Sequence, residues 1–285
     1  MIDLHLHTTA SDGTLSPTKL VERARAAGIR TLSVTDHDTM AGVGEAAETA
    51  ITQGLEFLPG IEITAVLDRR DVHILAYFLD PDPPGMAEFL LAARADRSRR
   101  ARETAVKLAN LGAPIEIEEL ITEANAKGHA VARPMVARAL VEAGHVPGVH
   151  EAFDRWLADG RPAYVARQGA SPAEVVRLVA RAGGVSALAH PGLLGKDELI
   201  PSLAQTGLGA IEVYHSAHGT AAKSHYAKLA QEHKLATCGG SDFHGDDHHR
   251  AKNFGEVGLP REKFMELFQR ILLAHSVAFG EQITS

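Results

Sequence analysis

Histidines and carboxylates recur where apolar segments end, and their types are those that bind metal ions. His5 and His7 lie two residues apart, so both rings project from one face of a strand. Asp12 follows in the next loop, and the further candidates are His37, Glu62, His73, His190, Asp242 and His244. Any one of these side chains could be a hydrogen-bonded core or loop residue. The whole set, with an H-x-H pair near one end of the chain and a D-x-H pair near the other, predicts a metal centre.

Nine candidate ligands are too many for one ion, so we expect two or three metal ions, with Glu62 free to bridge. Their mixture of nitrogen and oxygen donors suits Mn²⁺, Fe²⁺ or Zn²⁺ better than Ca²⁺ or an all-oxygen Mg²⁺ site. The positive charge of three divalent cations would exceed the negative charge of the three carboxylates. That surplus fits a hydroxide and an anionic phosphate ester, because clustered metals stabilise both oxygens in a displacement at phosphorus.

The segments that carry these residues predict alternating strands and helices. The predicted strands are 2–6, 31–35, 56–64, 72–78, 184–189, 211–214 and 235–238, and the predicted helices include 16–27, 42–53 and 171–182. This alternation is typical of a mainly parallel sheet or a (β/α) barrel. Because parallel strands open their carboxyl ends on one face, we expect six strands to deliver the candidate ligands there.

Residues 81–160 interrupt the alternation. The segment starts in a cluster of Pro, Asp and Gly, loses the strand pattern and becomes rich in arginine. We therefore predict a small helical domain inserted into a barrel domain made of residues 1–80 and 161–285.

The insertion carries a cluster of guanidinium groups, which suit bidentate phosphate recognition. Arg97 and Arg100 share a helix face at i, i+3, as do Arg99 and Arg102. Arg133 precedes Pro134 at a predicted helix start, where the side chain and the helix N-terminus could together hold an anion. The alternative is a solvated basic face paired with neighbouring acids. We predict that these five arginines bind substrate.

Composition excludes several classes of protein. The chain has 285 residues, a net charge of −7 and one cysteine, Cys238, so it can form neither a disulfide framework nor a thiolate zinc cluster, and a cytoplasmic location is expected. The first residues lack the basic and apolar parts of a signal peptide, and no apolar run is long enough to predict a membrane span. The acidic balance disfavours bulk binding of nucleic acid. We expect a small nucleotide or short RNA as the partner, and no stable protein partner.

In its motifs the sequence resembles the PHP family, named for polymerase and histidinol phosphatase. The matching motifs are Asp3-Leu4-His5-Leu6-His7 with Ser11-Asp12-Gly13, Val34-Thr35-Asp36-His37-Asp38, Pro59-Gly60-Ile61-Glu62, His73, Ala189-His190-Pro191 and Ser241-Asp242-Phe243-His244. The resemblance implies a distorted (β/α)7 barrel, similar to a TIM barrel, with three metal ions, usually Mn²⁺. It implies that the first is held by His5, His7, Glu62 and Asp242, the second by Asp12, His37 and His244, and the third by Glu62, His73 and His190.

The length, the Asp-Gly-Thr after Ser11 and the position of the insertion are most similar to one branch of that family. This branch contains 3′,5′-nucleoside bisphosphate phosphatases that also act as 5′→3′ exoribonucleases on short RNA. The resemblance therefore implies a phosphoric ester hydrolase that removes the 3′-phosphate from nucleoside 3′,5′-bisphosphates. We expect the metals to hold the 3′-phosphate and the arginines of the insertion to hold the 5′-phosphate.

The expected nucleophile is a hydroxide that bridges two metals. The leaving oxygen needs a proton from a side chain or a metal-bound water, and Asp38, His215 and His218 are the open candidates. Three other functions remain as alternatives: a histidinol-phosphate-type phosphomonoesterase, an amidohydrolase, and a non-catalytic module that binds nucleic acid or metal. The remaining histidines, His129, His145, His150, His225, His233 and His275, are expected to be structural, and residues 246–249 are expected to form a polar loop beside the site.

Overall fold

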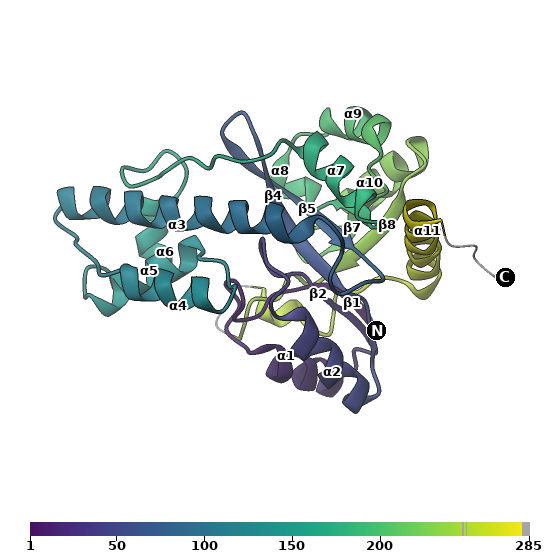
Figure 1. Cartoon of the computed structure of the whole chain (residues 1–285), viewed down its shortest axis with the longest axis horizontal. Coiled ribbons are helices and arrows are strands. Elements are labelled where there is room, and N and C mark those ends of the chain that lie inside the picture. The colour runs from purple at the N-terminus through teal and green to yellow at the C-terminus, as the bar shows by residue number, and fades with distance from the viewer. Residues whose placement is uncertain (247, 249, 281–285) are drawn as a thin grey trace.

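The computed structural model describes residues 1–246, 248 and 250–280 (Figure 1). The first part of the chain forms β1 (Ile2–Leu6), α1 (Pro17–Ala26), β2 (Thr31–Val34), α2 (Val43–Gln53), β3 (Glu56–Phe57), β4 (Gly60–Leu67) and β5 (Arg70–Tyr77). The middle is helical, with α3 (Met86–Asn110), α4 (Glu118–Ala126), α5 (Arg133–Glu142), α6 (Val149–Ala152) and a π-helical turn, η1 (Phe153–Leu157).

Alternation then resumes, as the sequence predicts. The elements are α7 (Pro172–Arg181), β6 (Val185–Leu188), α8 (Pro191–Leu194), α9 (Leu199–Thr206), β7 (Ala210–His215), α10 (Thr220–Glu232), β8 (Ala236–Gly240), a 3-10 turn, η2 (Ala251–Asn253), and α11 (Arg261–Phe279). None of the helices in the described ranges combines the length and the apolar character that crossing a membrane requires.

The strands form two sheets. One has the order β1-β2-β3 and is parallel; the other has the order β4-β5-β6-β7-β8 and is parallel from β6 to β8. Single bridges join the two sheets, between Leu6 and Phe243 and between His37 and Glu62. The predicted α/β class with parallel pairing is therefore confirmed.

One part of the predicted topology is wrong, because β5 runs antiparallel to both β4 and β6. Asp68 and Arg69 reverse the chain in a two-residue turn with positive φ angles of 51° and 65°. Glu62 and His73 consequently lie within their strands and not at the carboxyl ends. The hairpin still brings them together, because His73 pairs with Thr64, which points to the same face as Glu62.

The predicted helix starts have the expected caps. The Ser16 hydroxyl accepts a hydrogen bond from the backbone N–H of Lys19. Ser171 and Glu174 form a reciprocal capping box at the start of α7. These caps determine the residues at which α1 and α7 begin after the preceding loops.

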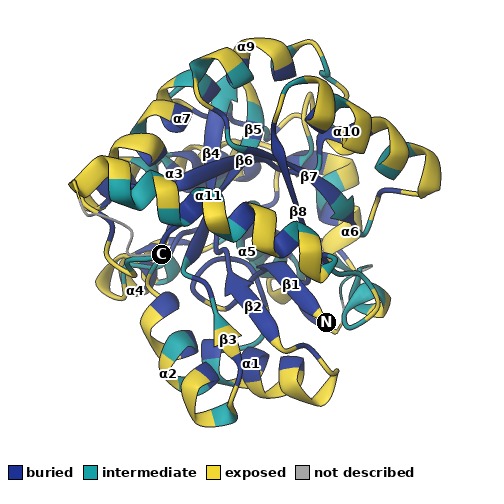
Figure 2. Cartoon of the chain, turned by 90° about the vertical axis from the view of Figure 1, so that its right-hand side faces the viewer, coloured by how far each residue is buried: buried dark blue, intermediate teal, exposed yellow. Residues whose placement is uncertain are grey.

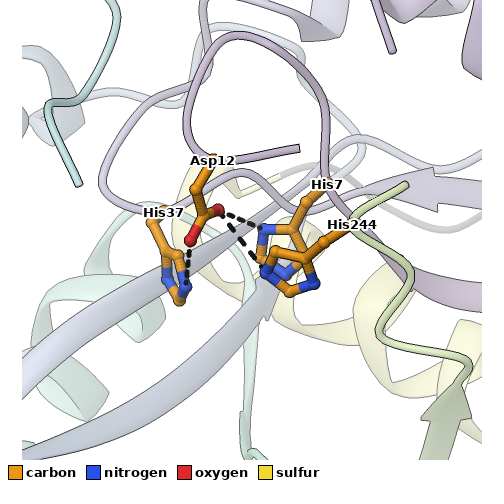
Figure 3. Close-up of side chains that lie close together, drawn as sticks. All are labelled: His7, Asp12, His37 and His244. Carbon is orange, nitrogen blue, oxygen red and sulfur yellow. Dashed lines mark ion pairs between the residues drawn. The ribbon is translucent and has the colours of Figure 1, made fainter. Parts of the chain in front are cut away.

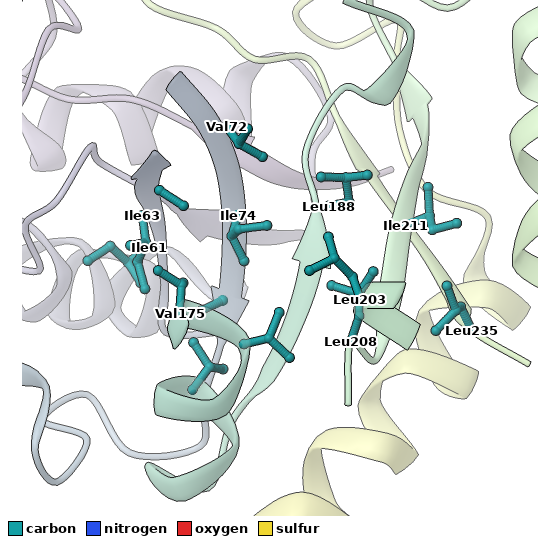
Figure 4. Packing of buried hydrophobic residues seen from close by; sticks show 14 of the residues in the cluster. Ile61, Ile63, Val72, Ile74, Val175, Leu188, Leu203, Leu208, Ile211 and Leu235 are labelled. Carbon is teal, nitrogen blue, oxygen red and sulfur yellow. The ribbon is translucent and has the colours of Figure 1, made fainter. Parts of the chain in front are cut away.

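Apolar side chains cover the strands on their outer side, so the strands are almost wholly buried (Figure 2). The largest cluster packs β4 to β7 against α7, α9 and α10 (Figure 4). A separate cluster, from Ala101 to Ala163, lies within the helical middle of the chain. Helix α3 belongs to both, since Met86 and Leu90 pack in the first cluster while Ala101 and Leu108 pack in the second.

Candidate metal centre

Glu62 lies at the centre of the histidine cluster and is 1% exposed. Its Oε2 atom is 3.2 Å from His5 Nε2, from His7 Nε2 and from His37 Nδ1. Its Oε1 atom is 2.9 Å from His73 Nδ1 and 3.0 Å from His190 Nε2. The two carboxylate oxygens thus face different sets of imidazoles, which is the arrangement a bridging ligand requires.

Asp12 lies beside a second group of rings, which come from the segments just after β1, β2 and β8 (Figure 3). Its oxygens are 3.6 Å from His7 Nδ1, 3.8 Å from His37 Nε2 and 3.5 Å from His244 Nε2. The ligand atoms of these four residues all lie within 4.8 Å of one another, which is compact enough to hold an ion.

Asp242 completes the cluster beside β1. Its Oδ1 atom is 3.3 Å from His7 Nε2 and 3.5 Å from His5 Nε2, and its Oδ2 atom contacts Arg250 and His215. All nine residues that the sequence singles out are therefore brought into one continuous cluster.

The residues present fit metal ions. Both ring nitrogens of His7, together with Nδ1 of His37 and Nδ1 of His190, are buried and make no well-aligned hydrogen bond within the described residues, although Glu62 Oε2 lies 3.2 Å from two of these atoms. Such groups are costly to leave unsatisfied, and a cation would supply their missing partner. Burial lowers the pKa values of His37, His190 and His244, whereas nearby carboxylates outweigh burial and raise the pKa values of His5, His7 and His73. The second group of rings would have to release protons on binding a metal ion.

The carboxylates are ready to bind cations as well. Burial by itself raises the pKa of Glu62, but the ring of imidazoles around it, among them His37, His73 and His5, outweighs this effect and holds that pKa well below its usual range. The pKa of Asp12 is likewise lowered, since His244 and His37 outweigh the effect of burial. Both groups are therefore ionised at neutral pH.

A pocket of about 190 Å³ connects this cluster to the helical middle of the chain. It is lined by Asp12, His37 and His73 of the cluster and by four arginines, Arg97, Arg100, Arg133 and Arg167. Phe153 and Tyr164 add aromatic surface to the same wall.

Two carboxylates, the buried Asp38 and the partly buried Asp71, hold these arginines in place. Asp38 Oδ2 accepts hydrogen bonds from Arg97 Nε (2.7 Å) and Arg167 Nη1 (3.0 Å). Asp71 lies 3.6 Å from Arg133 and from Arg167, and 3.9 Å from Arg100. Four guanidinium groups against two carboxylates leave a net positive pocket, which suits a phosphate dianion.

The structure does not bring Arg99 and Arg102 to this pocket. Arg99 pairs with Asp96 and Glu103, and Arg102 pairs through two hydrogen bonds with Glu118. The two predicted pairs of arginines therefore lie in different environments. Arg97 and Arg100 line the pocket, whereas Arg99 and Arg102 form the solvated basic face.

The three candidate proton donors do not line the pocket either. The pKa of Asp38 is lowered, because Arg97 and Arg167 outweigh the effect of burial, so it has no proton to donate at neutral pH. His218 is occupied by the Val213 carbonyl and the Gly192 N–H. His215 is fully buried, with Nε2 facing Asp242 at 3.2 Å.

Two residues that position the site escape the sequence analysis. Glu212 in β7 accepts a hydrogen bond from His5 Nδ1 (2.8 Å) and another from the His190 backbone N–H (2.7 Å). A lone carboxylate in the apolar run Ile211-Glu212-Val213 was an available signal. Arg167 lies in a loop, and nothing in its local sequence distinguishes it.

Other histidines bind locally, away from the cluster. His145, His150 and His225 contact Pro114, Asp154 and Asp197 respectively. In the loop after His244, Asp246 pairs with Arg23 and the ring of His248 lies 4.9 Å from that of His244, whereas residues 247 and 249 fall outside the described ranges.

Comparison with known proteins gives consistent results. Residues 3–112 match the model of the PHP domain. The chain is 35% identical to a 3′,5′-nucleoside bisphosphate phosphatase of Chromobacterium violaceum, over 85% of this chain and 87% of that protein. It is also 35% identical to the 5′-3′ exoribonuclease Rnm of Escherichia coli, over 85% of this chain and 84% of that protein.

A solved structure resembles the whole fold. This is a candidate metal-dependent phosphoesterase from Bifidobacterium adolescentis, with a TM-score of 0.86 and 32% identity over 94% of this chain and 96% of that one.

Proposed function

Because the chain belongs to the PHP domain family and is a metal-dependent hydrolase of phosphoester bonds, we propose that it removes the 3′-phosphate from nucleoside 3′,5′-bisphosphates. One observation carries this proposal: a single pocket is lined both by the candidate ligands Asp12, His37 and His73 and by a set of arginines. A substrate with two phosphates would place one against the candidate ligands and the other against the arginines.

The metal ligands in this proposal are the nine residues of the cluster, arranged as the resemblance implies. His5, His7, Glu62 and Asp242 would hold one ion, Asp12, His37 and His244 a second, and Glu62, His73 and His190 a third. The placement of Glu62 between two sets of imidazoles supports its shared role. Divalent cations, with Mn²⁺ the expected ion, would supply Lewis acidity that acidifies water and neutralises phosphoryl charge.

The chain's own residues then orient the nucleotide. Arg100, Arg133 and Arg167 would bind the 5′-phosphate, and Tyr164 and Phe153 offer surface for the nucleoside. Arg97 acts differently, because Asp38, Thr64 and the Val131 carbonyl already occupy its guanidinium. We assign it a positioning role that fixes α3 against β4.

We also propose the finer architecture and location that the sequence predicts. The bridges at Leu6 and His37 support a distorted seven-stranded barrel. A separate apolar cluster supports an inserted helical unit at residues 81–160. The single, buried cysteine supports a cytoplasmic location.

The test compares phosphate release from adenosine 3′,5′-bisphosphate, 3′-AMP, 5′-AMP and histidinol phosphate in the presence of Mn²⁺. We expect the bisphosphate to be hydrolysed with the highest kcat/KM. Arg133→Gln should raise KM for the bisphosphate by about tenfold, the lower end for a hydrogen bond to a charged group, and should leave KM for 3′-AMP unchanged. Arg102→Gln, on the solvated face, is the matched control.

An equal loss on both nucleotides after Arg133→Gln would refute the assignment of the 5′-phosphate. Preference for histidinol phosphate would instead favour the monoesterase alternative.

A further inference from the structure

A second pocket adjoins the first at the candidate metal centre. The two share Asp71, His73 and Arg133, and from there the second extends to His190, Arg70 and Lys196. It encloses about 290 Å³. A phosphate monoester at the cluster has one organic substituent, which the first pocket accounts for. In a phosphodiester the phosphorus carries a second organic substituent, and the second pocket could hold it.

The charges of this pocket are available to a ligand. Arg70 is exposed at the start of β5 and makes no ion pair within the described ranges. Lys196 pairs with Asp68 at 3.2 Å, but Asp68 is 73% exposed, and an exposed pair of this kind is weak and easily exchanged. Both cations can therefore turn to an incoming phosphate.

The same pocket offers an apolar surface. Leu193, in α8, lines it and remains 53% exposed. An exposed leucine near cationic side chains suits a nucleotide, because the face of the base is apolar and the phosphate is charged.

We propose that this second pocket binds the downstream strand of a 5′-phosphorylated RNA, with Arg70 and Lys196 on the phosphate that follows the scissile one. The proposal rests on the proposed function and extends it to a diester substrate. In the cleavage, water adds to phosphorus and the bond from phosphorus to O3′ of the first nucleotide breaks. That oxygen takes a proton, so a 5′-nucleotide leaves and the strand keeps the phosphate at its new 5′ end.

Two RNA substrates isolate the contact. The dinucleotide pApA contains the scissile phosphate and none beyond it, whereas the trinucleotide pApApA adds the phosphate that Arg70 and Lys196 would bind. The variant Arg70→Gln/Lys196→Gln should raise KM for the trinucleotide by about 25-fold, from about fivefold for each exposed pair. It should leave KM for the dinucleotide and for adenosine 3′,5′-bisphosphate within twofold.

The control is Arg181→Gln/Lys228→Gln, which removes the same charge from α7 and α10, outside both pockets. Equal KM changes on all three substrates, or none on the trinucleotide, would overturn the proposal. Hydrolysis of the bisphosphate without cleavage of either RNA would overturn it as well while leaving the proposed function intact. Hydrolysis of none of the three by the unaltered protein would refute both.

Discussion

Replacing Glu212 by Gln should weaken metal binding while the chain still folds. Glu212 is fully buried, and its two oxygens accept from His5 Nδ1 and from the His190 backbone N–H. While Nδ1 of His5 donates to Glu212, Nε2 faces Glu62 and Asp242 at 3.2 and 3.5 Å and is the nitrogen left to bind a cation once it is deprotonated. The carboxylate thereby selects the tautomer that can bind a cation.

A glutamine keeps the shape but has only one acceptor oxygen. If that oxygen stays with the His190 N–H, the amide donates to His5 Nδ1 and the ring proton moves to Nε2, where it blocks the metal. If the oxygen stays with His5 instead, two buried donors face each other at His190, which costs about 1–3 kcal/mol. Either arrangement is expected to reduce metal affinity by about 10- to 100-fold.

The assay is a calorimetric titration of the metal-free protein with Mn²⁺, accompanied by kcat for adenosine 3′,5′-bisphosphate. Thermal unfolding of the metal-free variant checks that the fold persists. Glu232→Gln, an exposed residue on α10, makes the same change of charge far from His5 and should bind Mn²⁺ normally. A folded Glu212→Gln protein with unchanged Mn²⁺ affinity would refute the positioning role.

Three further predictions concern stability. Asp38→Asn should lower the free energy of unfolding by about 3 kcal/mol, because it removes the anion that two buried guanidinium groups share. Since the folded pKa of Asp38 is depressed, its contribution is full at neutral pH and is lost gradually as the pH falls from about 4 toward that lower pKa. The difference between the two proteins in urea titrations should therefore shrink over this acid range, and a constant difference would contradict this. Gly240→Ala should lower Tm, since a Cβ there would collide with the His5 backbone and Asp3, and an unchanged Tm would show that β1 yields easily. Chelation by EDTA should lower Tm and added Mn²⁺ should restore it. At a thousandfold excess of Mn²⁺ over Kd, the free energy of unfolding should rise by about 4 kcal/mol, whereas a Tm insensitive to both treatments would exclude tight binding at the cluster.

Much of the site could be predicted because its residues stand in short motifs beside apolar strands. His5 and His7 follow from period-two spacing, and His37 and His190 from strand ends. The antiparallel hairpin was missed because its turn, Asp68-Arg69, lacks the glycine that usually marks a two-residue reversal. Its cross-strand pairing brings His73 to Glu62 by a route that parallel topology does not provide.

Contacts that depend on tertiary packing could not be predicted from neighbouring residues in the sequence. Arg97 and Arg99 have similar neighbours in sequence, and only the side on which α3 packs decides that one is buried and the other solvated. Arg167 matters because a loop passes beside Asp38, which lies 129 residues earlier. Glu212 was detectable in principle, as a charge within an apolar strand, but its partner could not be named.

The continuity of α3 limits how this enzyme can move. This helix of 25 residues, about 37 Å long, packs through Met86 and Leu90 in the cluster of β4 to β7 at one end, and at the other in the cluster from Ala101 to Ala163. The arginines on it cannot swing away from the metal ligands unless the helix bends, and Asp38 clamps it near its midpoint. The positions of these arginines relative to the candidate metal ligands are therefore set before substrate binds. A preset spacing reduces the entropy lost on binding, and under the proposed function it would favour substrates whose two phosphates match that distance.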